Sequence, residues 1–305
     1  MNGFINILKP PGLTSHDVVK YIRTLFPGVK VGHGGTLDPG AAGVLPILLG
    51  KATKFFSYIV DFSKIYRAEL FLGVSTDSAD SSGKIIAAKE PYTLDIEEIK
   101  KVLTSFTGEI QQTPPMFSAI KHKGKKLYEY ARRGKSIERK PRTVYIFYIK
   151  IIDYFPPKRV LLEVKCSKGT YVRTLCSQIG DALGFGGHMS FLLRREVGDF
   201  KLLQANTFEN LDHLSSMDNL KKAILPLDFP FQNGGKVVLN RDRVNSLIHE
   251  RFLPFNKSLD SATEPVDGKI VPVYTTKGDF VGLGRLEEDS SCNFVLKPEK
   301  IIIQV

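Results

Sequence analysis

The spacing of apolar and polar residues predicts a chain built from both strands and helices. Alternation, or enrichment in β-branched and aromatic residues, predicts strands at residues 6–11, 65–73, 144–153, 159–167 and 188–195. A helical period predicts helices at residues 15–26, 51–60, 95–106, 125–133 and 172–183. The two kinds of element follow one another without regular alternation, so we expect an α+β fold rather than a doubly wound parallel sheet.

Local signals refine several of these elements. Ser15 is a suitable N-cap for the first helix, and Asp95 with Glu98 three residues later predicts a capping box for the third. Residues 113–121 contain two consecutive prolines and are not predicted to be regular helix. Residues 75–83 (STDSADSSG) are predicted to be a loop, and their aspartates lack the spacing of an EF-hand calcium loop.

A domain boundary is predicted at residues 226–236 (PLDFPFQNGGK), where two prolines and a glycine pair interrupt the pattern. We therefore expect a large domain at residues 1–235 and a small β-rich domain at residues 236–305. The small domain should contain a helix at residues 241–249 and strands within residues 271–286. A chain of 305 residues is long enough for this division.

Composition narrows the class of protein. Hydrophobic residues make up 42% and charged residues 25% of the chain, which is ordinary for a globular protein. We expect neither a membrane span nor a signal peptide, and hence a cytoplasmic protein. The 3 cysteines form no CxxC pair, so neither a disulfide framework nor a structural zinc site is predicted.

The net charge of +11 is concentrated in one segment. Residues 121–142 contain ten Lys or Arg and two Glu, a net charge of +8, with Tyr128 and Tyr130 among them. Such a segment predicts a surface that binds nucleic-acid phosphates. Its candidate contact residues are Lys125, Lys126, Arg132 and Arg133. The alternative is a solvated helix face without a ligand.

Residues 32–49 (GHGGTLDPGAAGVLPILL) carry the strongest candidate for chemistry. A single carboxylate, Asp38, lies among glycines and small apolar residues, with His33 nearby. The following apolar run, residues 44–49, anchors the loop in a core. Asp before Pro often marks only a turn or a helix N-cap, but a plain cap does not need glycines on both sides. A loop of this kind can present a catalytic side chain.

A longer stretch, residues 32–54 (GHGGTLDPGAAGVLPILLGKATK), resembles the signature of the TruB-type tRNA pseudouridine synthases. Further segments resemble the same family, so that the likeness covers most of residues 1–230: LKPPG at 8–12, KIYR at 64–67, PPMFSAIK at 114–121 and VKCSKGTYVRTL at 164–175. The resemblance implies a catalytic domain built on a mixed or antiparallel sheet. It also implies that residues 236–305 form a PUA-like RNA-binding domain, although this tail has nine basic and ten acidic residues over positions 237–305. An accessory β-domain without RNA contacts is the alternative.

The resemblance implies three catalytic residues. Asp38 would be the nucleophile, and Arg173 would pair with its carboxylate. Tyr66 would stack on the target base and lie where the C5 proton leaves. Without the resemblance, Tyr66 in an alternating strand would be a core residue, and Arg173 at a helix start would be a surface charge.

The same resemblance implies residues that contact the RNA or support the site. His33 would enter the space left by the flipped nucleotide, unless it only caps a turn. Lys9 with Pro10 would support the catalytic loop. Tyr171 and Leu193 would line the pocket. Cys166 and Cys176, by contrast, are expected to be small buried apolar residues.

The implied reaction converts the T-loop uridine at tRNA position 55 into pseudouridine. The glycosidic bond breaks, the base turns, and the ribose rejoins the base at C5. No redox change and no group donor are needed, so we expect neither a cofactor nor a metal. A carboxylate could attack as a nucleophile or stabilise a ribosyl cation, and the sequence leaves both routes open. An enzyme that works on a base must also extract it from its stack.

The expected partner is the T arm of tRNA, without an obligatory protein partner. Three alternatives stay open. A guide-RNA-dependent pseudouridine synthase shares the aspartate motif but depends on protein partners. An RNA methyltransferase that uses Cys166 or Cys176 would need a glycine-rich loop after a strand, whereas residues 183–187 (LGFGG) follow a predicted helix. An RNA chaperone would use the basic segment alone.

Overall fold

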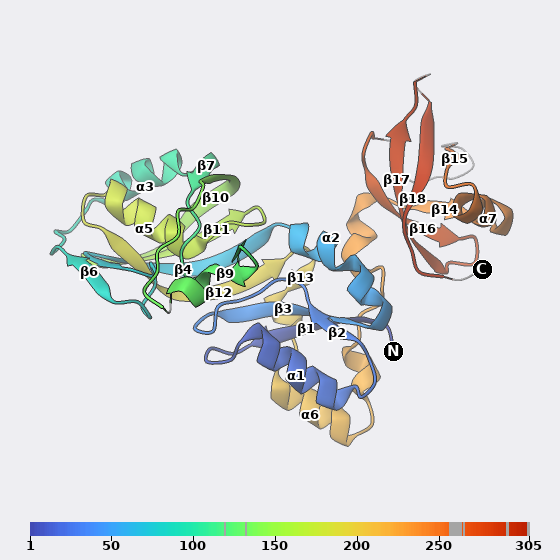
Figure 1. The fold of residues 1–305 in the computed structure, drawn as a ribbon, viewed down its shortest axis with the longest axis horizontal. Helices are drawn as coiled ribbons and strands as arrows, with labels where there is room; N and C mark the ends of the chain where they lie inside the picture. Colours follow the sequence, from blue (N-terminus) through green and yellow to red (C-terminus); the bar gives the residue numbers. More distant parts are fainter. Residues whose placement is uncertain (119, 132, 256–263, 265, 291–292, 304–305) are drawn as a thin grey trace.

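The computed structural model describes the whole chain except residues 119, 132, 256–263, 265, 291–292 and 304–305. Its main body is a nine-stranded sheet (Figure 1). In spatial order its strands are β1 (Gly3–Lys9), β3 (Ala42–Leu49), β12 (Gly187–Val197), β4 (Lys64–Leu72), β11 (Arg159–Cys166), β10 (Arg142–Phe155) and β7 (Gly108–Gln112), with β2 (Val31–His33) paired to β3 and β13 (Phe200–Lys201) paired to β12. Neighbouring strands are antiparallel except β3 and β12, which are parallel. The α+β prediction with a mixed sheet is confirmed.

Helices cover the two ends of this sheet separately. At one end, α1 (Ser15–Leu25) and α6 (Phe208–Ser216) lie side by side and share a core with β1 and β3 (Figure 1). At the other end, α3 (Ile96–Ser105) and α5 (Val172–Ala182) pack on β4, β10 and β11. Between the strands of these two cores lies β12, which pairs with β3 on one side and β4 on the other. The Asp38 loop leads into β3, next to β12.

Capping explains where the helices begin. The box of Asp95 and Glu98 is confirmed at α3. The predicted N-cap of α1 is wrong by one residue, because Thr14 and Asp17 form the capping box instead. Ser15 is turned inward and buried, and its hydroxyl exchanges hydrogen bonds with the backbone of Leu37.

Three other predicted elements differ in detail. The helix expected at residues 51–60 begins as a 3-10 helix, η1 (Gly50–Phe55), and continues as α2 (Phe56–Asp61). The helix expected at residues 125–133 is shorter, α4 (Leu127–Ala131), because residues before it pair in a hairpin of β8 (Lys121–His122) and β9 (Lys125–Lys126). The loop expected at residues 75–83 overlaps β5 (Val74–Thr76), which pairs with an unpredicted strand, β6 (Ile85–Ala88).

The C-terminal residues form a second, five-stranded sheet. Its spatial order is β14 (Val237–Leu239), β16 (Ile270–Thr275), β17 (Phe280–Glu288), β18 (Phe294–Ile301) and β15 (Leu253–Pro254), accompanied by α7 (Arg241–His249). Three 3-10 helices lie on the way to it: η2 (Leu202–Gln204), η3 (Leu220–Ala223) and η4 (Phe229–Gly234). The predicted C-terminal helix and strands are confirmed, whereas the boundary at residues 235 and 236 stays a prediction.

The second sheet shares an apolar core with the main body. Leu283 of β17 and Ile302 belong to one apolar core with Phe55 and Ile59 of the main body. This shared core joins the C-terminal sheet to η1 and α2 (Figure 1). No helix among the described residues is long and apolar enough to cross a membrane.

Candidate active site

Asp38 lies in the loop that connects β2 to β3. Its neighbours Leu37 and Ala41 are buried, whereas 43% of the Asp38 side chain is exposed. The Ala41 N–H donates to the Asp38 carbonyl at 3.0 Å, which makes a tight turn. Gly43, at the end of the loop, has a φ of +119° and lies against the backbone of Arg194, where a Cβ atom would collide. The loop therefore presents one carboxylate from a well-anchored frame.

Lys9 holds the loop from the side of β1. Its side chain is fully buried, and its ammonium donates to the carbonyls of Leu13 (2.7 Å), Pro10 (2.9 Å) and Pro39 (3.3 Å). Burial lowers the pKa of Lys9 to about 8, although the nearby Asp38 carboxylate opposes this shift. Lys9 is thus hydrogen-bonded to Pro39, the residue that follows Asp38, and its supporting role stays a prediction.

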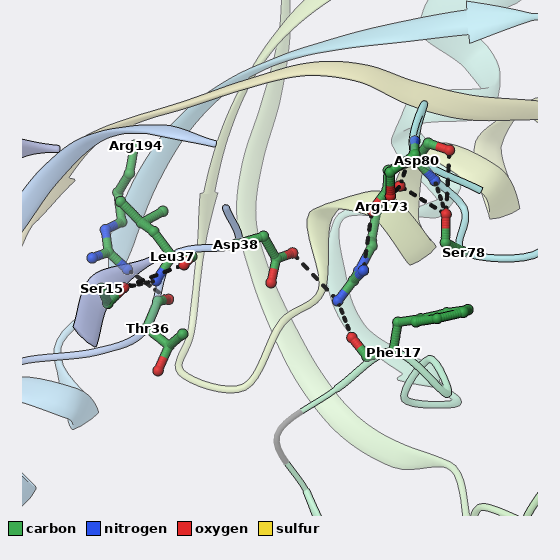
Figure 2. A network of polar contacts seen from close by, with 10 residues as sticks. Ser15, Thr36, Leu37, Asp38, Ser78, Asp80, Phe117, Arg173 and Arg194 are labelled. Atoms are coloured by element: carbon green, nitrogen blue, oxygen red, sulfur yellow. Dashed lines mark hydrogen bonds and ion pairs between the residues drawn. The ribbon is translucent and has the colours of Figure 1, made fainter. Parts of the chain in front are cut away.

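Arg173 faces Asp38 from the first turn of α5 (Figure 2). Only 5% of its side chain is exposed, which contradicts the alternative of a surface charge. Its guanidinium lies 3.3 Å from the Asp38 carboxylate and 3.1 Å from that of Asp80, and it donates to the Phe117 carbonyl at 2.6 Å. One buried cation therefore joins three segments that are distant in sequence.

Electrostatics distinguish the two carboxylates. Burial raises the pKa of Asp38, and the Arg173 charge opposes this shift. Burial alone would also raise the pKa of Asp80, but hydrogen bonds from Ser82 and Ser78, together with Arg173, bring it below the usual value. Asp80 is thus the more firmly ionised partner of Arg173, while Asp38 is the more exposed of the two carboxylates.

Tyr66 is the third residue of β4 and lies opposite Val164 on one side and Arg194 on the other. It is almost fully buried and belongs to the same core cluster as Leu37 and Ala41, which flank Asp38. Burial raises the pKa of Tyr66 to about 12. Tyr66 is therefore a core residue, and the charges of Arg194 and Asp38 both act on its hydroxyl.

The other predicted residues are placed around this centre. His33 ends β2 half-buried, and burial, then Arg194 and His16, lower its pKa. The Tyr171 ring lies 5.8 Å from the Arg173 guanidinium. Leu193 pairs with Arg67 on β4, so strand alternation directs it to the sheet face opposite to that of Tyr66, and the register does not bring it to the Asp38 group. The catalytic and contact roles stay predictions.

The basic segment is connected to the site through the chain that leaves Phe117. The Tyr128 and Leu127 N–H groups at the start of α4 donate to the carbonyls of Ser118 (3.1 Å) and Ile120 (2.8 Å). Lys125, Lys126 and Arg133 are exposed on this hairpin and the turn after α4. Arg132 lies outside the described residues. The exposed lysines thus adjoin the segment that holds Arg173.

The thiols are poor candidates for chemistry. Cys166 and Cys176 are buried, and burial raises the pKa of each to about 12. A thiolate is therefore scarce at neutral pH, which disfavours the methyltransferase alternative. Within the described part of the chain, no group of three or more His, Cys, Asp or Glu side chains could hold a metal ion.

Two residues of the site were missed by sequence reasoning. Asp80 was considered only for calcium, in a loop without a family motif. Arg194 follows the predicted Leu193 and is the largest of the fully buried side chains. Its neighbour in the structure is Tyr66, far away in the chain. A signal existed for Arg194 alone: it stands two positions after Leu192, so this charged residue shares a face of the predicted strand with an apolar one.

Comparisons with known proteins agree on one family. The model of "TruB family pseudouridylate synthase (N terminal domain)" matches residues 23–172, and that of "tRNA pseudouridylate synthase B C-terminal domain" matches residues 173–232. The chain is 46% identical over 304 residues to a tRNA pseudouridine synthase B of Alkaliphilus oremlandii, covering 100% of this chain and 99% of that protein. It is 40% identical to the protein of the same name from Clostridioides difficile, over 99% of this chain and 100% of the relative.

Solved structures give the same result. A Cbf5-Nop10-Gar1 complex contains a chain that is 30% identical, with a TM-score of 0.75, covering 99% of this chain and 85% of that one. An H/ACA RNP bound to a substrate RNA containing 2′-deoxyuridine contains a similar chain at 27% identity and a TM-score of 0.73, with coverage of 99% and 85%. The likeness therefore extends through both sheets.

Proposed function

Because the chain belongs to the TruB family of pseudouridylate synthases, we propose that it converts uridine in tRNA into pseudouridine. The proposed target is the T-loop uridine at position 55. The observation that carries this proposal is the solvent-accessible Asp38 carboxylate, set 3.3 Å from a buried guanidinium. Such a pair keeps a carboxylate ionised and aimed toward a substrate.

Asp38 has two possible roles in the first step. In one, its carboxylate attacks C1′ of the ribose as N1 of the uracil leaves with the bonding electron pair. In the other, the C1′–N1 bond breaks first and the carboxylate stabilises the ribosyl cation. In both routes the uracil turns and its C5 bonds to C1′, which in the first route breaks the bond between C1′ and the Asp38 carboxylate. The C5 proton is then lost, and N1 takes up a proton. Arg173 acts in either route by orienting Asp38.

Tyr66 is proposed to receive the flipped base and to lie where the C5 proton leaves. Its ring packs in the core cluster that includes the neighbours of Asp38, which supports this placement. A base taken out of its stack needs an aromatic or apolar surface to receive it. His33 is proposed to fill the space that the flipped nucleotide vacates.

Binding of the T arm is proposed to combine phosphate contacts with shape. The exposed Lys125, Lys126 and Arg133 supply positive charge beside the site. The C-terminal sheet is proposed to act as a PUA-like RNA-binding domain. The isomerisation consumes no reagent, so we propose that it uses no cofactor. We also propose that the protein acts in the cytoplasm, because its proposed substrate is tRNA.

The test is incubation of the purified chain alone with an unmodified tRNA transcript, without any added small molecule. Pseudouridine should form at one position, 55. A matched transcript with cytidine at that position should remain unmodified. Modification of bare tRNA would exclude a guide-RNA-dependent enzyme that needs protein partners. RNA refolding without pseudouridine formation would favour the chaperone alternative and overturn the proposal.

A further inference from the structure

A second buried arginine, Arg194, lies on the other side of the Asp38 loop from Arg173 (Figure 2). Only 1% of it is exposed. Its guanidinium donates to the carbonyls of Val44 (2.8 Å), Gly35 (2.9 Å) and Thr36 (3.4 Å). These carbonyls precede and follow Asp38 in sequence, so one side chain joins the two ends of the loop.

The backbone of Arg194 fastens the same loop a second time. At this point β12 pairs with β3 in parallel, with Leu193 opposite Ala42 and Arg194 opposite Gly43. Side chain and backbone of one residue therefore hold the start of the loop and its end at the same time. Any shift of Arg194 would be transmitted directly to Asp38.

The charge of Arg194 is not explained by these hydrogen bonds alone. Among the described residues, no carboxylate lies within ion-pair distance of its guanidinium. A buried cation without an ionic partner is costly, and backbone carbonyls could also be held by a neutral donor. The hydrogen bonds therefore do not account for the positive charge of Arg194, and we expect this charge to have a function of its own.

The surroundings of Arg194 indicate what the charge acts on. The Arg194 charge interacts with five titratable groups on four segments of the chain. They are Asp38 of the loop, Tyr66 and Lys64 of β4, Lys9 of β1 and His33 of β2. Asp38 is the one carboxylate among these five. Burial raises the pKa values of Asp38 and Tyr66, and the Arg194 charge opposes both shifts. Burial lowers the pKa values of the other three groups, and the Arg194 charge lowers them further.

We infer that Arg194 is a positioning residue of the active site, which clamps both ends of the Asp38 loop and adds a buried positive charge to the surroundings of Asp38. This inference rests on the proposed pseudouridine synthesis. Arg194 touches no reacting atom in this assignment and acts through Asp38. Arg173 contacts the carboxylate itself, whereas Arg194 fixes the loop that carries it.

The experiment separates the clamp from the charge with two variants. Arg194→Met removes the charge, and Arg194→Lys retains a charge but loses the planar fork of donors. The matched control is Arg195→Met, because Arg195 is the next residue of β12 and pairs with Glu163 on the other sheet face. Single-turnover rates of pseudouridine formation are measured from about pH 5 to about pH 9, where carboxylates with raised pKa values titrate. Circular dichroism and tRNA affinity are measured for each protein.

Both Arg194 variants should react about 10²-fold more slowly than the parent, because a displaced catalytic group loses that much. Their tRNA affinity should be unchanged. Loss of a nearby positive charge raises a carboxylate pKa, so the acid limb of the rate profile should move to higher pH in Arg194→Met. The limb should stay at its parent position in Arg194→Lys. Arg195→Met should match the parent throughout.

An acid limb that is the same in Arg194→Met and the parent would overturn the assigned role of the charge. If Arg194→Met does not fold, Arg194→Lys decides: a slowed reaction with the parent acid limb supports the inference, and a parent-like rate overturns it. A parent protein that forms no pseudouridine would refute the proposed function itself. The two failures are therefore distinguishable.

Discussion

Deletion of residues 237–305 should destabilise the main body as well as weaken tRNA binding. The rings of Phe55 and Phe280 lie 6.1 Å apart across the junction between the two sheets. The Tyr58 hydroxyl donates to Glu299 at 2.8 Å, and the Lys51 ammonium donates to the Ile302 carbonyl at 3.0 Å. The deletion removes every C-terminal member of these contacts.

The magnitude follows from what the deletion uncovers. Complete burial of a large apolar side chain contributes about 1.5–3 kcal/mol, so half-uncovering Phe55 and Tyr58 costs about that amount in total. The lost hydrogen bond of Tyr58 adds about 1 kcal/mol. The sum is about 2.5–4 kcal/mol, a large share of the roughly 5–15 kcal/mol that stabilises a typical native protein.

The assay is urea unfolding of the full-length and truncated chains, followed by far-ultraviolet circular dichroism. The control is full-length Tyr58→Phe, which loses only the hydroxyl and leaves Glu299 paired with Arg285 at 3.0 Å. That variant should lose about 1 kcal/mol. A truncated protein that unfolds at the same urea concentration as the parent would refute the shared core.

Three further predictions concern the site and its ligand. Asp80→Asn removes a carboxylate 3.1 Å from the Arg173 guanidinium, so the single-turnover rate should fall by about 10²-fold with unchanged tRNA affinity. The control, Asp77→Asn in the same loop, should react at the parent rate. A parent-like rate in Asp80→Asn would contradict the role assigned to its contact with Arg173. Charge reversal of Lys125 and Lys126 should weaken tRNA binding and reduce the slope of log affinity against log salt by about 0.7–0.9 for each lost phosphate contact; an unchanged slope would mean that these lysines are only solvated. Pseudouridine formation should survive a strong chelator, because the isomerisation consumes nothing, and a loss of rate that one metal ion restores would refute the cofactor-free mechanism.

Features that depend on residues close together in the chain could be predicted from the sequence. Strand alternation, the capping box at Asp95 and the glycines around Asp38 each act within a few residues. The family resemblance added the partnership of Asp38 with Arg173, which periodicity could not provide. The structure places these two side chains 3.3 Å apart, although they are far apart in the chain.

Features that depend on contacts between residues distant in the chain were not predicted. Ser15 has the composition of an N-cap, yet the neighbouring Thr14 takes that position and frees Ser15 to bind the backbone of Leu37. Asp80 became significant only when folding brought Arg173 to it. The shared core at Phe55 was also hidden, because its partners belong to a segment that the composition at residues 226–236 predicts to be separate.

The most direct test of the account is the Asp38→Asn variant in the bare-tRNA assay. The change keeps the size of the side chain and removes its charge, leaving Arg173 with Asp80 as its ionic partner. The matched control is Asp61→Asn, which removes an exposed carboxylate paired with Lys168. We expect the parent and Asp61→Asn to form pseudouridine at one tRNA position, and Asp38→Asn to bind tRNA normally and form none. A folded Asp38→Asn protein that still produces pseudouridine would contradict the central claim.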